Sequence, residues 1–400
     1  MASFSAGMGL YSFAGRAESA NFGIFIHVYD LLKSEYVDKT VDDTKLLQGA
    51  IRGMLESIGD PYTRYMDPQA FRGMQEERQG SFSGIGIQLG MKGDQLTVIA
   101  PLDDTPAAKA GLLAGDKIMA IDTKVTKGLA VEEAVNLIRG KSGTTVILKM
   151  QRGEKVRDVP IVRGSIETKT VRARMIDKSV GYIRLASFMS NEATNEMKKA
   201  VEDLKGKGLK ALVLDLRMNP GGLLPNAVDI GSMFIEKGAV VQIVDRNGVK
   251  QTQDVSGHPM LKNDIPMVVL IDGGSASASE ILAGALKDQK RATLMGTRSF
   301  GKGLVQTVHP LQDGSGVAIT TNKYLTPNGT DINHKGIEPD VLVELPKPKE
   351  GQVYTPETDP QLLRAVSLLK DRLAHKEPKR DSGGEIKRGC APGGVWGGRP

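Results

Sequence analysis

The 400-residue sequence contains very little cysteine and few aromatic residues. Its one cysteine, Cys390, excludes an internal disulfide and a metal site built from several cysteines. Aromatic residues make up 4% of the chain, which argues against nucleic-acid binding by base stacking. The histidines lie far apart and form neither H-x-x-x-H nor H-E-x-x-H, so a zinc hydrolase is not expected. We therefore expect no metal and no cofactor.

Long apolar runs and charge of a single sign are also missing. No stretch of about 18 apolar residues is present, so the sequence predicts no transmembrane helix. The 53 basic and 47 acidic residues are interspersed, and a net charge of +6 is weak evidence for a polyanionic partner. We expect no nucleic-acid partner. With 40% hydrophobic and 25% charged residues, the chain is typical of globular proteins and long enough for two or three domains.

The two ends of the chain show the weakest patterns. Residues 1–20 are a candidate remnant of an export signal, because the small residues of Ala17–Ala20 follow a mildly apolar stretch; the basic segment of such signals is missing. Apolar spacing between Phe22 and Ser57 predicts two amphipathic helices, so we assign residues 1–79 to an N-terminal helical region. Residues 376–400 are rich in Pro, Gly and charge, which predicts a disordered tail.

Residues 80–165 predict a small separate domain. A glycine-flanked G-I-G-I loop starts a predicted strand at Gly84. The sequence T-P-A-A-K-A-G-L of Thr105–Leu112 predicts a short helix that a glycine ends, and Gly115–Asp122 predicts a turn and a strand. In this combination the three motifs resemble a PDZ domain, a small β-sandwich with two helices.

The glycine-flanked loop of this segment is a candidate peptide-binding site. Backbone N–H groups of such a loop can capture a terminal carboxylate, while the edge of the following strand pairs with an extended peptide. The alternative is a β-sandwich without a ligand. The residues of the candidate loop are Gly84, Ile85, Gly86 and Ile87.

Residues 166–375 alternate predicted strands and helices, which indicates an α/β core with further strands toward the C-terminus. Two predicted strands end in glycine-rich corners, at Asn219–Gly222 and at Gly273–Gly274. In open α/β folds the ligand crevice lies at the carboxyl ends of strands. We therefore expect the chemistry of this chain at these two corners.

A cluster of serines, Ser275–Glu280 with the sequence S-A-S-A-S-E, follows the apolar run Met267–Ile271 and precedes a predicted helix. A serine at a strand-to-helix turn is well placed for nucleophilic attack, because the helix N–H groups and dipole favour developing negative charge. The alternative interpretation is that these serines are ordinary N-caps.

A nucleophilic serine needs a base, and no histidine has the local context of a catalytic triad. A lysine can take this role if burial lowers its pKa enough for the amine to be partly neutral. Lys302 lies between Gly301 and Gly303, and an extended chain would put Gln306 on the same face to hold the amine. The alternatives are an ordinary surface lysine and a phosphate-binding loop, but Gly303 lacks the hydroxyl that such a loop requires.

Three segments together resemble the carboxyl-terminal processing (tail-specific) serine proteases of peptidase family S41. They are Leu214–Gly222, Ser275–Glu280 and Phe300–Gly303 with Gln306, and the resemblance covers roughly residues 28–369. It implies a multidomain α+β fold that combines an N-terminal helical region, a PDZ domain at 80–165 and a serine protease core at 166–375. It also implies a serine endopeptidase.

The resemblance assigns a role to each site residue. Ser277, the middle serine, is implied to be the nucleophile, and Lys302, 25 positions later, the general base. Gln306 is implied to position the lysine. The oxyanion hole is implied to consist of the backbone N–H groups of Gly221 and Ala278, and glycine suits such a hole because no Cβ obstructs it.

The resemblance further implies protein or peptide substrates with free, apolar C-termini, an adaptor protein, and an extracytoplasmic location, either in the periplasm or at the outer face of the cell membrane. A homo-oligomer through the N-terminal helices is expected, because Leu31, Leu32, Leu46 and Leu47 give more apolar surface than two short helices need. The alternative function is a catalytically inactive scaffold that keeps the S41 fold and the PDZ domain. A PDZ adaptor alone would leave the α/β half unexplained.

Overall fold

The computed structural model describes residues 15–38, 40–102, 104–129, 131–167, 169–346 and 354–376. Predictions on residues 1–14, on Cys390 and on the tail from 377 lie outside the described residues. The chain forms two compact units: Met1–Pro68 with Val308–Ile319, and Gln69–Thr307 with Thr320–Pro400. We describe each unit by itself.

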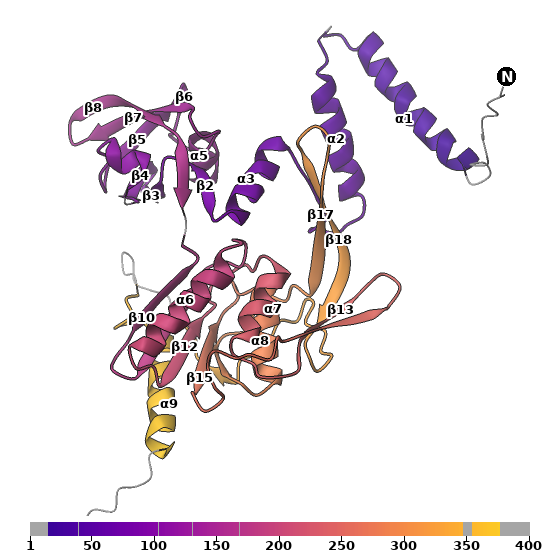
Figure 1. Ribbon diagram of the computed structural model, residues 1–400. Coiled ribbons are helices and arrows are strands. Elements are labelled where there is room, and N and C mark those ends of the chain that lie inside the picture. Colours follow the sequence, from indigo (N-terminus) through magenta and orange to yellow (C-terminus); the bar gives the residue numbers. More distant parts are fainter. Residues whose placement is uncertain are drawn as a thin grey trace, which may run out of the picture. The chain divides into compact units, whose positions relative to one another are not determined.

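The first unit contains the two predicted helices, drawn in indigo in Figure 1. They are α1 (Gly15–Glu35) and α2 (Asp43–Glu56), and the Asp42 side chain caps α2 by accepting hydrogen bonds from two backbone amides of its first turn. A short strand, β1 (Arg64–Met66), pairs antiparallel with the beginning of β18 (Gly316–Leu325). The sequence predicted the helices but not this strand pair, whose partners are some 250 residues apart in the chain.

The segment resembling a PDZ domain forms an antiparallel sheet in the order β3-β4-β5-β7-β8, with β6 paired to β5. Its buried apolar side chains, including Leu96, Ile118 and Leu148, form a core of their own. A two-stranded ribbon joins the segment's entry to its exit, and β3 is an edge strand of the described sheet. α3 (Pro68–Arg78) precedes this segment. The elements that follow are β2 (Ser81–Gly84), β3 (Ile87–Lys92), β4 (Gln95–Pro101), α4 (Pro106–Lys109), β5 (Lys117–Ile121), β6 (Lys124–Val125), α5 (Val131–Ile138), β7 (Thr145–Arg152), β8 (Lys155–Val162) and β9 (Gly164–Glu167).

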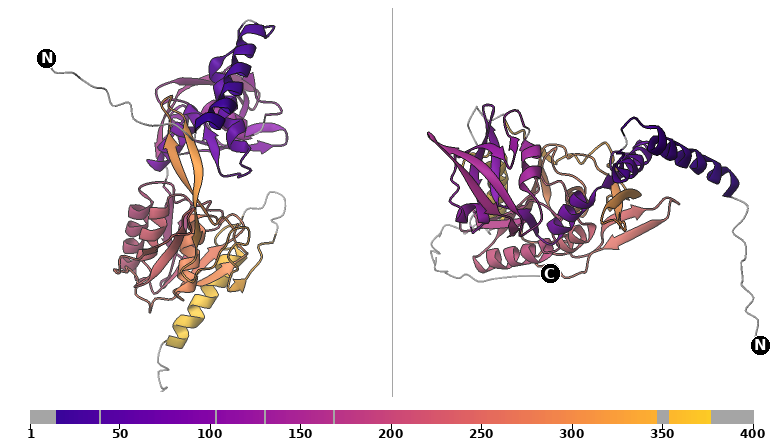
Figure 2. Two further views of the ribbon diagram at one scale, coloured as in Figure 1. Left: turned by 90° about the vertical axis from the view of Figure 1, so that its right-hand side faces the viewer. Right: turned by 90° about the horizontal axis from the view of Figure 1, so that it is seen from above.

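The protease-like core is a six-stranded sheet in the order β10-β11-β12-β15-β16-β19, parallel from β11 to β19. Three helices, α6, α7 and α8, pack on one face, and α9, yellow in Figures 1 and 2, packs on the other. Both faces are covered, and every residue of β12 and β15 is buried. All of these residues are apolar except Asp215, at the end of β12. The elements are β10 (Val171–Met175), β11 (Val180–Leu185), α6 (Ala193–Gly206), β12 (Ala211–Asp215), α7 (Leu224–Ser232), β15 (Met267–Ile271), α8 (Ala278–Asp288), β16 (Thr293–Gly296), β19 (Val341–Leu342) and α9 (Pro360–Lys376).

A second sheet accompanies the core. It contains β13 (Ala239–Val244), β14 (Lys250–Asp254), β17 (Leu304–Pro310) and β18, and β13 pairs antiparallel with both β14 and β18. β17 pairs with β18, and each of these two strands begins in one compact unit and ends in the other.

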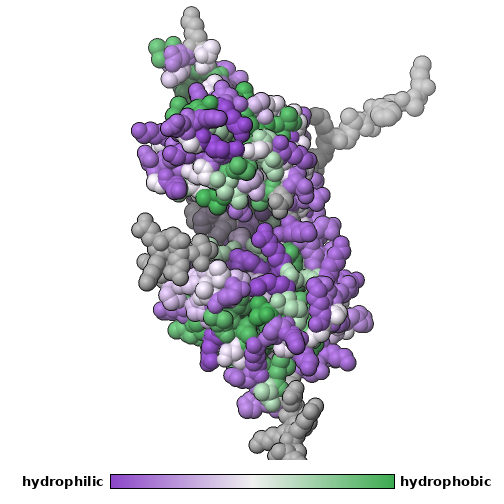
Figure 3. All heavy atoms as spheres, turned by 90° about the vertical axis from the view of Figure 1, so that its left-hand side faces the viewer, coloured by the Kyte–Doolittle hydropathy of each residue, from purple (hydrophilic) through white to green (hydrophobic). Residues whose placement is uncertain are grey.

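Hydrophilic and hydrophobic side chains are interspersed on the face that Figure 3 shows. Among the described residues, no helix combines the length and the apolar character needed to cross a membrane. The elements described above form the predicted α+β architecture, with an N-terminal helical region, a small β domain and an α/β core.

Candidate active site

Ser277 lies where the predicted nucleophile should lie, directly before α8 and at the carboxyl end of the central strand β15. Its backbone has φ 55° and ψ −116°, a conformation that non-glycine residues rarely adopt. An ordinary N-cap serine has extended backbone angles. The strained turn of Ser277 therefore differs from a simple cap, and such strain concentrates at functional sites.

The two neighbouring serines have structural roles. Ser275 is 1% exposed, and its hydroxyl donates to the carbonyl of Leu216 at 2.8 Å and accepts from the amide of Asp272 at 3.0 Å. Ser279 is fully buried, and its hydroxyl donates to the carbonyl of Asn219 at 2.9 Å. Both hydroxyls thus join the start of α8 to the corner after β12, whereas Ser277 is only half-buried.

The corner after β12 contacts the nucleophile through glycine. Gly221 has φ +96°, and a Cβ at this position would lie 2.6 Å from the carbonyl oxygen of Ala276 and 2.9 Å from Cβ of Ser277. No larger residue fits here without moving backbone atoms. The same Cβ would lie 2.8 Å from the amide nitrogen of Ala278, so the two residues predicted to supply the oxyanion donors, Gly221 and Ala278, lie close to each other beside Ser277. The Gly221 amide donates to Oδ1 of Asn219 at 2.9 Å, so it must share or release this hydrogen bond to serve an oxyanion.

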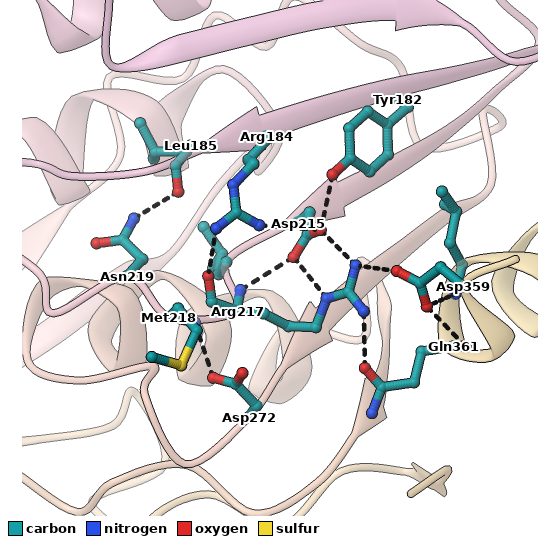
Figure 4. A network of polar contacts seen from close by, with 12 residues as sticks. Tyr182, Arg184, Leu185, Asp215, Arg217, Met218, Asn219, Asp272, Asp359 and Gln361 are labelled. Atoms are coloured by element: carbon teal, nitrogen blue, oxygen red, sulfur yellow. Dashed lines mark hydrogen bonds and ion pairs between the residues drawn. The ribbon is translucent and has the colours of Figure 1, made fainter. Parts of the chain in front are cut away.

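A buried ion network holds the same corner (Figure 4). The Asp215 carboxylate, fully buried, receives Nε and Nη2 of Arg217 at 2.9 and 2.6 Å and the hydroxyl of Tyr182 at 2.7 Å. Arg217 also donates to Asp359 at 2.7 Å and to Gln361 at 2.8 Å, both at the start of α9.

The charges of this network shift each other's pKa values. Burial alone would raise the pKa of Asp215, but the Arg217 guanidinium and the Tyr182 hydroxyl hold it below its ordinary value. Burial and the neighbouring carboxylate raise the pKa of Tyr182 to about 12. The network is thus ionised at neutral pH, with Asp215 negative and Arg217 positive.

Lys302, the predicted base, is half-buried, and its backbone is fixed to the nucleophile segment. Its amide donates to Oε2 of Glu280 at 2.9 Å, the oxygen that also accepts the amide of Ser277 at 2.9 Å. The hydroxyl of Tyr324 donates to the carbonyl of Lys302 and lies 3.1 Å from the carbonyl of Ser277. The structure therefore brings Ser277 and Lys302 together through two shared partners.

The glycines on either side of Lys302 have a packing reason. A Cβ on Gly301 would lie 2.8 Å from the amide of Gly336, and a Cβ on Gly303 would lie 3.0 Å from Asn333. The segment around Lys302 can pass close to residues 333–336 only because both flanking positions are glycine. This contact joins the lysine segment to a later segment of the chain with which the sequence alone did not connect it.

Gln306 lies on β17, four residues after Lys302, as the extended pattern predicted. Its side-chain NH₂ group donates to the hydroxyl of Thr320 on β18 at 3.1 Å. The amide oxygen is its only acceptor atom, so this oxygen is the atom that would receive a hydrogen bond from a lysine amine. Its role in positioning Lys302 stays a prediction.

In the loop proposed to bind a terminal carboxylate, two backbone carbonyls accept hydrogen bonds from amides of the same β domain. The carbonyl of Ile85 accepts from the amide of Ala107 at 2.8 Å, and that of Gly86 accepts from the amide of Leu102 at 2.9 Å. Since C=O and N–H point in opposite directions across a trans peptide, the amides of Gly86 and Ile87 face away from these partners. Gly86 must be glycine, because it has φ +75° and a Cβ would lie 2.4 Å from Thr105.

Three family models match successive parts of the chain. The N-terminal domain of the activating protease CtpB matches residues 13–70, a PDZ domain matches 83–162, and peptidase family S41 matches 179–343. A carboxy-terminal-processing protease of Bartonella bacilliformis is 43% identical over 345 residues, 84% of this chain and 77% of its own length. The carboxy-terminal processing protease CtpA of Bacillus subtilis is 42% identical over 320 residues, which cover 80% and 68% of the two chains.

The chain belongs to peptidase family S41. Among solved structures, the photosystem II D1 C-terminal processing protease is 34% identical, with a TM-score of 0.51 over 82% of this chain and 95% of its own. An S41 protease structure from Bacteroides fragilis shares the fold, with 17% identity and a TM-score of 0.54 over 86% and 97% of the two chains. This chain is therefore a serine peptidase of the carboxy-terminal processing kind with a PDZ domain, as the three sequence motifs predicted.

Two side chains of this S41 site escaped the sequence analysis. Glu280 follows Ser277 by three positions, and this spacing of Ser and Glu is the capping-box pattern, so a local signal was present. Tyr324 gave no signal, because its contact with the site depends on the pairing of β18 with β13. Within the described ranges, no group of three or more His, Cys, Asp or Glu residues is arranged to hold a metal ion.

Proposed function

We propose that the enzyme hydrolyses peptide bonds with a Ser277–Lys302 dyad and recruits its substrates by their C-termini. The observation that carries the dyad is the convergence of the two residues. The amides of Ser277 and Lys302 donate to one carboxylate oxygen, at 2.9 Å each, although the residues are 25 positions apart. The two flanking serines support this choice, since both hydroxyls are bound to backbone carbonyls.

The reaction divides into two acyl transfers. A neutral Lys302 amine takes the proton of the Ser277 hydroxyl while Oγ attacks the scissile carbonyl carbon, and the amides of Gly221 and Ala278 stabilise the resulting oxyanion. The lysine ammonium then returns the proton to the departing amine, leaving an acyl ester on Ser277. The neutral amine of Lys302 next takes a proton from a water molecule, whose oxygen attacks the ester carbon and forms a second tetrahedral intermediate. When this intermediate collapses, the carboxylic acid leaves and the lysine ammonium returns its proton to Oγ of Ser277, which restores the serine hydroxyl.

Recruitment depends on the PDZ domain. The amides of Gly86 and Ile87 face away from the domain interior and suit a terminal carboxylate. The edge strand β3 offers its free side to an extended peptide, and the partly buried Leu89 and Leu137 line the apolar surroundings of that strand. An apolar C-terminal residue fits this lining best.

The two parts of the proposal are tested with one unstructured peptide that ends in an apolar residue. The free acid should be hydrolysed at a higher kcat/KM than the same peptide with a C-terminal amide, and Ser277→Ala should abolish both reactions. Equal rates for acid and amide would contradict C-terminal recruitment. An absence of hydrolysis for both peptides would favour the inactive scaffold.

We further propose a homo-oligomer formed through the N-terminal helices. In a single copy of the chain, Phe22 and Ile26 on α1 are 69% and 53% exposed. Leu31, Leu32 and Leu47 are also exposed, by 38–54%. Burial of such side chains is worth about 1.5–3 kcal/mol each. Sedimentation velocity of the purified protein should give a dimer or larger species, and a monomer at micromolar concentration would contradict the proposal.

The enzyme is proposed to act outside the cytoplasm, in the periplasm or at the outer face of the cell membrane, and to receive some substrates from an adaptor protein. The support is the mildly apolar N-terminal stretch with its small residues at Ala17–Ala20. Cell fractionation should recover the native protein in the extracytoplasmic fraction. Recovery in the cytosol would contradict this proposal.

A further inference from the structure

Glu280 is a buried carboxylate with an unusually complete set of donors. It is 1% exposed, in the first turn of α8. Its Oε2 accepts the amides of Ser277 and Lys302 at 2.9 Å each, and its Oε1 accepts the amide of Gly301 at 2.7 Å and the hydroxyl of Ser299 at 2.5 Å. A capping box requires only the first of these four hydrogen bonds.

The four donors come from two separate segments. The Ser277 amide belongs to the nucleophile turn, while the other three donors belong to the loop that carries the lysine. Two amides that each lie 2.9 Å from one oxygen cannot be more than twice that distance apart. The position of one carboxylate therefore limits the separation between the backbones of Ser277 and Lys302.

We propose that Glu280 is a positioning residue that sets the spacing and orientation of the Ser277–Lys302 dyad, a role that depends on the proposed function. Proton transfer from serine to lysine requires the two side chains within hydrogen-bond reach. Glu280 supplies this geometry from the backbone side without contacting the substrate.

A further hydrogen bond holds one of the donors to the Glu280 carboxylate in place. The hydroxyl of Ser299, which donates to Glu280, accepts the amide of Ile337 at 2.7 Å. Ile337 lies in the segment Lys335–Pro339, so a third part of the chain supports the Glu280 carboxylate indirectly, through Ser299. Rotation of the Glu280 side chain would break its hydrogen bonds to the nucleophile turn and to the lysine loop, and the hydroxyl of Ser299 would lose its acceptor.

The informative variant is Glu280→Gln, which keeps the size of the side chain. An amide offers one acceptor oxygen and one NH₂ group, so one of the two donor pairs would face another donor. We expect kcat to fall about 100-fold with KM changed less than about three-fold, because a displacement of about 1 Å suffices for such a loss. The pH–rate profile is recorded in parallel and compared with that of the wild type.

Glu196 provides a matched control. Its Oε2 accepts the amides of Thr170 and Val171 and the hydroxyl of Thr170 at 2.8–3.0 Å, so it makes the same kind of contact on α6, outside the site. Glu196→Gln should lower Tm but leave kcat and the pH–rate profile unchanged. If Glu280→Gln also lowers only Tm, the positioning role is overturned.

Two further sets of variants keep the test decisive. If Glu280→Gln does not fold, Ser299→Ala removes one donor to Oε1; a three- to ten-fold loss of kcat, of about the size expected for one hydrogen bond, supports the proposal, and an unchanged kcat overturns it. Ser277→Ala and Lys302→Ala are measured in parallel. Activity in either would refute the dyad itself, whereas inactivity of both with a fully active Glu280→Gln would refute only the role of Glu280.

Discussion

The two halves of the dyad are held by very different parts of the fold. On the nucleophile side, β12 and β15 are buried at every residue, and polar side chains such as Asp215, Ser275 and Ser279 are buried and hydrogen-bonded. On the lysine side, Lys302 is half-buried and leads into β17, whose residues are half-buried or exposed. That strand also extends into the compact unit that contains the N-terminal helices.

This difference separates a fixed partner from an adjustable one. Moving Ser277 requires breaking buried hydrogen bonds, each of which costs about 1–3 kcal/mol when a partner is left unsatisfied. The Lys302 side chain is itself half-buried, and the strand that follows it contains no fully buried residue. We therefore expect changes on the nucleophile side to affect stability and activity together, and changes on the lysine side to affect activity alone.

The largest expected effect comes from the lysine itself. Lys302→Ala should lower kcat by about 10²–10⁴-fold, the usual contribution of a general base, with little change in Tm. Lys302→Arg should be equally inactive, because a guanidinium stays protonated. In the wild type, activity should rise toward mildly alkaline pH, as the lysine must lose a proton from an ordinary pKa of about 10.4, and it should survive EDTA. Steady-state kinetics against pH, with and without EDTA, check this.

On the nucleophile side, Gly221→Ala should damage both properties. Its Cβ would lie 2.6 Å from a backbone oxygen at φ +96°, so we expect a loss of about 1–3 kcal/mol in stability and at least about a 100-fold loss of kcat. Gly273→Ala, in the loop before the nucleophile, is the control, because a Cβ there meets no atom within 4 Å. A stable, active Gly221→Ala enzyme would show that the corner at Gly221 can accept a side chain. Thermal unfolding measures the loss of stability, and steady-state kinetics measure the loss of kcat.

Gln306→Ala tests the adjustable side more gently. Loss of the amide oxygen should lower kcat about 10- to 100-fold by leaving the lysine amine unrestrained, and Tm should stay within about 2 °C, since the residue is only half-buried. Thr320→Val removes the hydroxyl that accepts from Gln306 and should cause a smaller loss in the same direction. An unstable but fully active Gln306→Ala enzyme would reverse the comparison.

The smallest effect concerns acid stability on the fixed side. The pKa of Asp215 is lower in the folded protein than its ordinary value of 3.8, so the ionised carboxylate stabilises the folded state at pH values above 3.8. This stabilisation is lost as the pH falls through the lower pKa of the folded state. Tyr182→Phe removes one donor that holds this pKa down, so acid unfolding should begin at a higher pH, with about 1 kcal/mol lost at neutral pH. Circular dichroism between pH 2 and about 5 measures the shift. Tyr354→Phe is the control, because the hydroxyl of Tyr354 donates to an exposed carbonyl, that of Pro346.

The sequence predicted those features that short segments determine. The S-A-S-A-S-E turn, the glycine corner and the glycine-flanked lysine each carry a local pattern, so Ser277, Lys302 and the α/β order could be proposed from residues alone. The roles of Tyr324 and Asp359 could not, because both depend on contacts between elements distant in sequence. The pairing of β1 with β18 escaped prediction for the same reason.

The central claim is that Ser277, not a neighbouring serine, is the nucleophile that Lys302 activates. Its most direct test is kcat for Ser275→Ala, Ser277→Ala and Ser279→Ala on one unstructured peptide with a free apolar C-terminus. We expect Ser277→Ala to be inactive while remaining folded, and the other two to lose less than about ten-fold, since Ser279 loses a hydrogen bond to a backbone carbonyl and Ser275 loses hydrogen bonds to a backbone carbonyl and a backbone amide. Turnover by Ser277→Ala, or an inactive but folded Ser275→Ala or Ser279→Ala enzyme, would contradict the account.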